Sequence, residues 1–113
     1  MLTLEKLNSA NEYIQILTNA IVEKLEPEKI ILFGSFAYGT PTIKSDIDIL
    51  VIVKNSPMNR SERTGKLYVE LKEFSKFPKD LLVYTIEEAK KWESVRQAFI
   101  TSIQKNGQVL YER

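Results

Sequence analysis

The sequence predicts an α/β protein with a small β-sheet. Three short apolar runs, at residues 30–33, 46–53 and 80–85, are rich in β-branched side chains and are typical of strands. Longer segments before the first run and after the second and third carry apolar residues at helical spacing. Pro and Gly residues separate several of these segments. Strands that alternate with helices in this way are the pattern of α/β folds.

The first helix is expected over residues 3–25, where Leu and Ile residues recur at helical spacing. Thr3 is its candidate N-cap. Asn8 and Ser9 form a polar step at which this helix can loosen or split. Near the other end of the chain, residues 109–111 are expected to form a last edge strand.

Two further helical regions follow the second and third strands. Residues 60–76 place their apolar side chains on one face, and Asn59 or Ser61 can cap this helix. A helix here would supply the crossover that two parallel strands require. Residues 85–88 match a capping box that opens another helix, whose apolar spacing continues to about Lys105.

Length and composition limit the classes of protein to consider. The chain has 113 residues, so we expect a single domain covering residues 1–113. The hydrophobic content of 43% and the charged content of 27% are ordinary for a globular protein. A net charge of +1 gives no overall attraction to nucleic acid or to a membrane surface. This argues against a stand-alone polymerase, which needs a basic channel, and predicts no strong nucleic-acid binding.

Two residue types are absent from the sequence, and their absence restricts its chemistry. The chain has no Cys, which excludes disulfides, thiolate metal sites and cysteine nucleophiles. It has no His, which removes Ser-His-Asp triads and most zinc sites and leaves carboxylates for acid–base work. No signal peptide is visible, and no apolar run approaches the roughly 18 residues of a membrane span. We therefore expect a cytoplasmic protein with no membrane partner.

The first candidate site residues are Gly34 and Ser35, directly after the first predicted strand. Glycine permits positive φ and lets another group approach the backbone closely. If a short helix begins near Phe36, its free N–H groups favour an anion at this corner. The alternative interpretation is an ordinary strand-to-helix turn capped by Ser35.

Two aspartates open the second predicted strand, ten residues after the Gly-Ser pair. Side chains alternate between the faces of a strand, so Asp46 and Asp48 share one face, roughly 7 Å apart. A cation between two such carboxylates relieves their repulsion, and oxygen ligands alone suit Mg²⁺. The alternative is that both residues simply begin a strand at the surface. Aspartate is depleted in strands, and Asp48 lies within an apolar run, which favours the metal site.

A third carboxylate, Asp80, begins the third predicted strand. If this strand lies beside the second one, Asp80 can join Asp46 and Asp48 in one cluster. A solvated strand end is the alternative interpretation.

Taken together, these motifs resemble those of the DNA polymerase β-like nucleotidyltransferases. Gly-Ser, ten intervening residues, Asp-x-Asp and a later strand-borne Asp form the shared pattern, over residues 30–88. The short chain and residues 79–88 are similar to the minimal nucleotidyltransferases of bacteria and archaea. The resemblance implies the nucleotidyltransferase fold, with a small mixed sheet of three to four strands and helices packed mainly on one face.

The resemblance also implies roles for individual residues. Asp46 and Asp48 would bind metal, and Asp80 would bind a second metal or activate the acceptor hydroxyl. Gly34 and Ser35 would hold the phosphates of a nucleoside triphosphate. The implied cofactors are two Mg²⁺ ions with ATP as substrate. The implied reaction is in-line attack of a hydroxyl on the α-phosphorus, with pyrophosphate as the leaving group.

One part of the motif departs from the family pattern. Many relatives carry Arg at the position of Phe36 or Tyr38, where an Arg fork would contact phosphate. Lys44 can supply positive charge instead, so we place Lys44 and Ser45 among the nucleotide-binding residues. The alternatives are a solvated Lys44 and aromatic side chains that pack under the loop rather than stack on a base.

The family resemblance further implies a partner. Minimal nucleotidyltransferases of this kind resemble the antitoxin half of a system whose other half is a HEPN ribonuclease, and this implies AMP transfer to a tyrosine of that toxin. HEPN domains use an Arg-x4-6-His motif, which a chain without His cannot contain. Two alternatives stay open. One is an antitoxin that acts by binding alone, and the other is a small-molecule nucleotidyltransferase. Homo- and hetero-oligomers are both compatible with the sequence.

Overall fold

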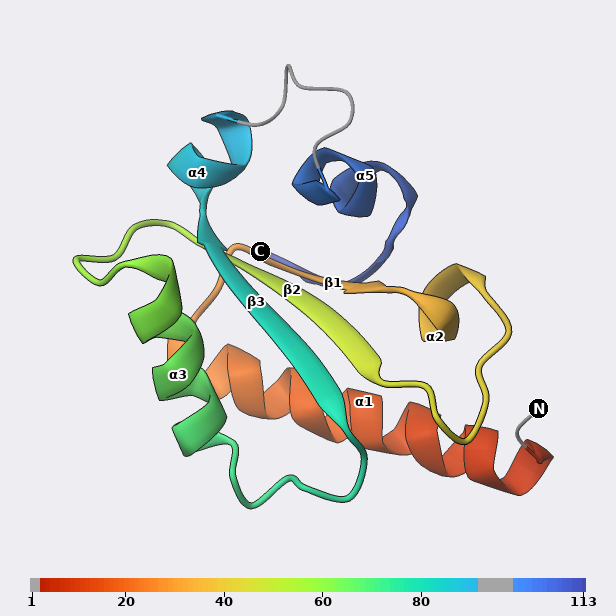
Figure 1. Cartoon of the computed structure of the whole chain (residues 1–113). Coiled ribbons are helices and arrows are strands. Elements are labelled where there is room, and N and C mark those ends of the chain that lie inside the picture. Colours follow the sequence, from red (N-terminus) through yellow and green to blue (C-terminus); the bar gives the residue numbers. More distant parts are fainter. Residues whose placement is uncertain (1–2, 92–98) are drawn as a thin grey trace.

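A computed structural model of the chain describes residues 3–91 and 99–113. Helices and strands alternate through most of its length (Figure 1). In chain order, the elements are α1 (Leu4–Leu25), β1 (Lys29–Phe33), α2 (Ser35–Tyr38), β2 (Ile47–Val53), α3 (Arg60–Glu70), β3 (Lys79–Thr85), α4 (Ile86–Lys91), α5 (Phe99–Asn106) and β4 (Gln108–Glu112).

The strands form one mixed sheet with the order β3-β2-β1-β4. β1 pairs antiparallel with both β2 and β4, whereas β2 and β3 run parallel. Helix α3 connects the two parallel strands, as the sequence predicts. The last edge strand predicted at residues 109–111 is also confirmed, as β4. The expected α+β fold with a small mixed sheet is therefore present.

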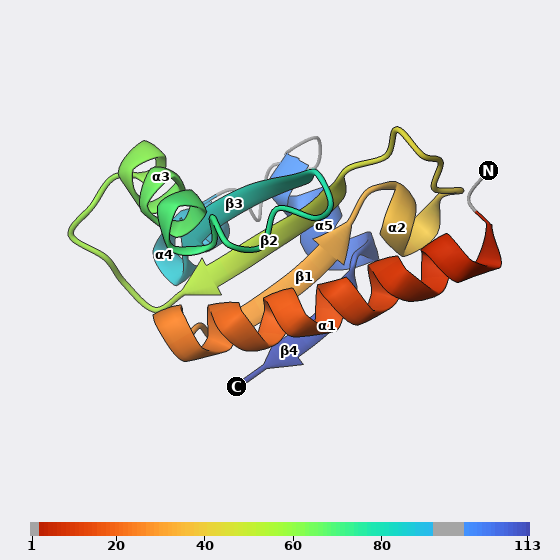
Figure 2. The same ribbon diagram turned by 90° about the horizontal axis from the view of Figure 1, so that it is seen from below.

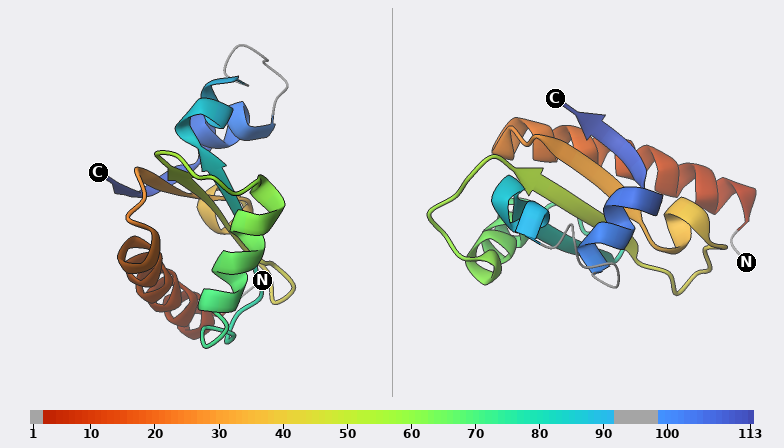
Figure 3. Two further views of the ribbon diagram at one scale, coloured as in Figure 1. Left: turned by 90° about the vertical axis from the view of Figure 1, so that its left-hand side faces the viewer. Right: turned by 90° about the horizontal axis from the view of Figure 1, so that it is seen from above.

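Helices cover both faces of this sheet, in layers of different size. Helices α1 and α3 lie on one face, and the shorter α4 and α5 lie on the other (Figure 3, left). Figure 2 shows α1 running along the length of the sheet. We expected helices mainly on one face of the sheet, and the two longer helices, α1 and α3, do share one face. The expectation did not include the smaller helical layer that α4 and α5 form on the other face.

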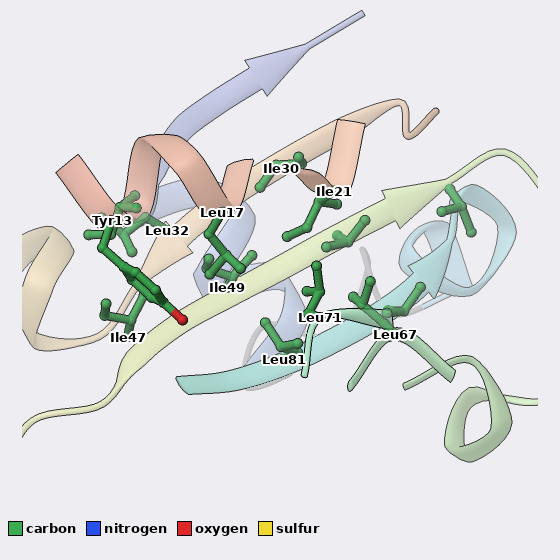
Figure 4. Packing of buried hydrophobic residues seen from close by; sticks show 14 residues of the cluster. Tyr13, Leu17, Ile21, Ile30, Leu32, Ile47, Ile49, Leu67, Leu71 and Leu81 are labelled. Atoms are coloured by element: carbon green, nitrogen blue, oxygen red, sulfur yellow. The ribbon is translucent and has the colours of Figure 1, made fainter. Parts of the chain in front are cut away.

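Strand β2 is central and contributes side chains to both cores. Ile47, Ile49 and Val51 point to the α1 and α3 side, where they join the larger cluster (Figure 4). Leu50 and Ile52 alternate with them and join the smaller cluster under α4 and α5. The near-continuous apolar run of β2 reflects this burial on two faces. Because of the same alternation, Asp48 belongs to the α4 and α5 side.

Helix α1 is one continuous helix of 22 residues, so the predicted break near Asn8 and Ser9 does not occur. Asn8 is exposed and Ser9 is only half-buried, so these polar residues do not interrupt the buried stripe. Thr3 caps the helix as predicted, with its Oγ1 accepting from the N–H of Lys6 at 3.2 Å. None of the helices among residues 3–91 and 99–113 is long and apolar enough to cross a membrane.

Helix α3 begins as the sequence predicts but ends earlier. Asn59 forms a complete capping box with Glu62, so Asn59 rather than Ser61 is the N-cap. The helix ends at Glu70 instead of continuing to residue 76. The chain turns there, with a 2.8 Å bond from the N–H of Phe74 to the carbonyl of Leu71. This turn carries the carbonyl of Phe74 to the Tyr13 hydroxyl of α1, a contact that a continued helix would prevent.

The second predicted capping box is confirmed at the start of α4. The N–H of Thr85 donates to Glu88 Oε1 at 2.9 Å, and the N–H of Glu88 donates to Thr85 Oγ1 at 3.1 Å. The helix predicted from here to about Lys105 corresponds at its two ends to α4 and α5. Its middle part, residues 92–98, lies outside the described residues.

Candidate active site

The corner between β1 and α2 is built on Gly34, which has a φ of 75°. A Cβ atom added at Gly34 would lie 2.1 Å from Asp48 Oδ2, so a side chain here would displace this carboxylate, and the positive φ also favours glycine. Helix α2 begins at Ser35, one residue earlier than expected, and Gly34 rather than Ser35 takes the N-cap position. The structure thus has a strand-to-helix turn in which Gly34, not Ser35, is the cap, and phosphate binding at this corner stays a prediction. The structure places Gly34 and Ser35 directly against the Asp-x-Asp strand.

The three predicted carboxylates lie at one end of β2 and β3. Asp48 and Asp80 are direct neighbours in the parallel register of these strands. On its other side, Asp48 lies opposite Phe33, the residue before Gly34. Asp46 immediately precedes β2. The predicted adjacency of the second and third strands therefore brings Asp80 to the Asp-x-Asp pair.

The charges of these three side chains act on one another. Burial, and then repulsion from Asp80 and Asp46, together raise the pKa of Asp48 from 3.8 to about 6. Asp48 is half-buried, whereas Asp46 and Asp80 are exposed. A half-buried carboxylate held beside two others accumulates negative charge that a bound cation would neutralise.

These residues fit a divalent cation by the chemistry of their donors. All three supply carboxylate oxygens, which Mg²⁺ prefers. Within residues 3–91 and 99–113, however, no group of three or more Asp, Glu, His or Cys side chains is gathered closely enough to hold a metal ion. The backbone brings the three aspartates to one place without closing their side chains into a coordination shell. Their role as metal ligands stays a prediction.

Ser45 and Lys44 lie in a turn just before Asp46. The N–H of Ser45 donates to the carbonyl of Thr42 at 3.0 Å, and Ser45 Oγ accepts from the N–H of Thr42 at 2.9 Å. The N–H of Lys44 donates to Thr42 Oγ1 at 3.2 Å. The Ser45 hydroxyl thus shapes the loop that leads into the Asp-x-Asp strand. The Lys44 residue is exposed, and nucleotide binding by either residue stays a prediction.

The two aromatic residues of α2 have different environments. Phe36 is partly buried against the larger core cluster, as the packing alternative predicts. Tyr38 is 58% exposed. Neither residue restores the cationic fork that an Arg would provide at this corner.

A residue that the sequence analysis missed lies beside the carboxylates. The hydroxyl of Tyr68, on α3, accepts from the N–H of Leu81 at 2.9 Å and donates to the carbonyl of Lys79 at 3.2 Å. These two backbone groups flank Asp80. No local pattern indicates this contact, because it depends on how α3 lies against β3.

Comparison with known proteins identifies the family. A family model described as the nucleotidyltransferase domain matches residues 14–110. The chain belongs to this family. The nucleotidyltransferase domain thus includes the β1–α2 corner, the Asp-x-Asp strand and Asp80, and it is part of the DNA polymerase β-like superfamily.

Two individual proteins resemble this nucleotidyltransferase domain. A Methanocaldococcus jannaschii protein, provisionally named a protein adenylyltransferase, is 59% identical over 34 residues. The match covers 30% of this chain and only 23% of that relative's length. A solved structure from Sulfolobus solfataricus, provisionally called a nucleotidyltransferase, superposes with a TM-score of 0.66. The superposition covers 97% of this chain and 86% of the Sulfolobus solfataricus chain. Because the two sequences are only 20% identical, this similarity supports the fold alone.

Proposed function

We propose that this nucleotidyltransferase domain is a Mg²⁺-dependent enzyme that transfers AMP from ATP to a hydroxyl group. The observation that carries the proposal is the placement of Asp48 between Gly34 and Asp80. One carboxylate there contacts the glycine corner expected to hold phosphate and faces a second carboxylate across the strands. Asp46 adds a third negative charge at the same end of the sheet.

Each residue has a definite part in the proposed reaction. The backbone at Gly34 and Ser35 would hold the phosphates, and the glycine at position 34 leaves room for the Asp48 carboxylate beside it. Asp46 and Asp48 would hold Mg²⁺, with Asp80 holding a second ion or accepting the proton of the acceptor hydroxyl. When bound, Mg²⁺ neutralises phosphate charge and stabilises the attacking and leaving oxygens. The acceptor oxygen forms a bond to the α-phosphorus, the bond to the β-phosphate oxygen breaks, and pyrophosphate leaves.

The proposed acceptor is a tyrosine of a partner HEPN toxin, which would make the chain an antitoxin. The resemblance to minimal nucleotidyltransferases supports this acceptor. The 34-residue match to a relative provisionally named a protein adenylyltransferase also supports transfer to a protein.

A transfer assay tests the proposal. The purified chain is incubated with Mg²⁺ and α-labelled ATP, with and without the protein encoded beside its gene. The double variant D46N/D48N removes two carboxylates from the site. E12Q/E23Q is the matched control, because it removes two carboxylates from exposed positions of α1.

The outcomes separate the proposed function from its alternatives. Label on the neighbouring protein that is lost in D46N/D48N and retained in the control supports protein adenylylation. A stable complex without label on any protein favours an antitoxin that acts by binding alone. Label on small hydroxyl compounds in the absence of a partner favours a small-molecule nucleotidyltransferase.

A further inference from the structure

Strand β3 forms an outer edge of the sheet. Among the residues that the structure describes, no strand pairs with the outward backbone groups of β3. At one place on this edge, a side chain forms hydrogen bonds with these outward backbone groups. The Tyr68 hydroxyl bonds to both the Lys79 carbonyl and the Leu81 N–H, at 3.2 and 2.9 Å.

The position of this bridge along β3 is specific. Lys79 and Leu81 are the neighbours of Asp80, and their backbone groups point to the side opposite that of Asp80 because direction alternates along a strand. The backbone of Asp80 therefore faces β2, where Asp80 lies beside Asp48. The chain at Asp80 is thus held from two sides, by β2 on one side and by the Tyr68 hydroxyl on the other.

The surroundings of Tyr68 keep its hydroxyl protonated. Burial raises the pKa of Tyr68, the bond from the Leu81 N–H acts in the opposite direction, and the three aspartates raise it again. A neutral phenol both donates and accepts, as the two bonds require.

We propose that Tyr68 is a positioning residue that fixes the edge strand at Asp80, so that Asp80 stays beside Asp48 at the end of the sheet where a metal would bind. The inference rests on the proposed function, since it gives Asp80 a metal. The ordinary alternative is that Tyr68 only covers a free strand edge and contributes stability.

Tyr68→Phe is the test variant, because it retains the ring and removes only the bridging hydroxyl. Tyr84→Phe is the matched control on the same strand. The Tyr84 hydroxyl accepts from Arg60 at 2.5 Å, and the same guanidinium lies over the Tyr84 ring. Removing the Tyr84 hydroxyl therefore leaves the Tyr68 bridge to the backbone beside Asp80 in place. Urea unfolding of both variants establishes that each one folds.

Two measurements test Tyr68→Phe, one at the backbone of β3 and one at the candidate metal site. Amide hydrogen exchange at Leu81 should be faster in Tyr68→Phe than in the wild type, since its acceptor is gone. Calorimetric titration with Mn²⁺ should give binding about tenfold weaker in Tyr68→Phe and unchanged in Tyr84→Phe. The same titration of D46N/D48N establishes whether Mn²⁺ binds at the aspartates.

The results separate the positioning role of Tyr68 from the proposed metal-dependent function. If Leu81 exchanges faster in Tyr68→Phe while Mn²⁺ affinity is unchanged, the positioning role is overturned and the metal site stands. If Tyr84→Phe weakens Mn²⁺ binding as much as Tyr68→Phe does, the effect comes from a general disturbance of β3, and the specific role of Tyr68 is overturned. If the wild type and D46N/D48N bind Mn²⁺ equally or not at all, both proposals fail together.

Discussion

The ion pair between Arg63 and Glu88 joins α3 to the start of α4, and Glu88→Gln measures what it contributes. Two 2.7 Å hydrogen bonds link the guanidinium to the carboxylate. Arg63 has a side chain only 4% exposed, whereas that of Glu88 is 35% exposed. Removing the carboxylate therefore leaves a buried guanidinium without its counter-charge.

The pKa of Glu88 sets the size of the effect. The hydrogen bonds from Arg63 are the largest cause that lowers the pKa of Glu88 from 4.5 to about 2. The N–H of Thr85 and the charges of Arg63 and Arg60 act in the same direction, and burial opposes them. A shift of this size corresponds at most to about 3.4 kcal/mol, and solvent screening at a side chain one-third exposed reduces this to about 2 kcal/mol. At pH 7, urea unfolding of Glu88→Gln followed by circular dichroism should show that loss, as a midpoint lowered by about 1 M.

The control is Glu87→Gln, the same change at the exposed neighbouring position, which should alter the free energy of unfolding by less than about 0.5 kcal/mol. Because the folded-state pKa of Glu88 is depressed, its contribution is present above about pH 4.5 and is lost as the pH falls toward 2. The difference between wild type and Glu88→Gln should shrink over that range. Equal stabilities of Glu88→Gln and Glu87→Gln at pH 7 would refute the reasoning.

Two further predictions concern the carboxylates and the glycine corner. Asp48→Asn should stabilise the metal-free protein at pH 7 by about 1–2 kcal/mol, because the raised pKa of Asp48 makes its ionised form unfavourable in the fold. This gain should be present above about pH 6 and vanish below pH 4 in urea unfolding, and a gain that persists at pH 3.5 would contradict it. Gly34→Ala should cost about 1–3 kcal/mol in unfolding free energy and abolish transfer, because its Cβ collides with Asp48 Oδ2 at positive φ. Gly65→Ala, on α3 with open space around it, should instead stabilise by about 0.5–1 kcal/mol, and equal effects of the two changes would rule out the collision.

Local patterns in the sequence predict the elements and much of the site. Short apolar runs rich in β-branched side chains identify the strands, and the capping residues Thr3, Asn59 and Thr85 mark three helix starts. The helical crossover predicts that β2 and β3 are parallel neighbours, and this alone brings Asp80 beside Asp48. These successes share a cause, because each depends on residues close together in sequence or on a simple rule of chain connection.

The failures concern contacts between residues that are far apart in sequence. Arg63 shares its helical spacing with Arg60 and Lys66, a pattern typical of a solvated helix face, yet the Arg63 residue is only 5% exposed. The partner of the buried Arg63 guanidinium is Glu88, which lies 25 residues later at the start of α4. The sequence of α3 alone does not indicate this partner. The Tyr68 contact is equally non-local. Helical periodicity identifies a face but not the partner that covers it.

The close contact of Gly34 with Asp48 has an evolutionary consequence. A protein of this fold that needs the carboxylate is bound to keep glycine at position 34, since any side chain would displace Oδ2. A lineage that no longer needs the carboxylate can exchange it for a smaller residue, and position 34 is then free to drift toward residues that tolerate its φ of 75°. Across a large set of relatives, substitutions at these two positions should therefore arise together. Their joint loss would mark the members that have kept the fold for binding alone.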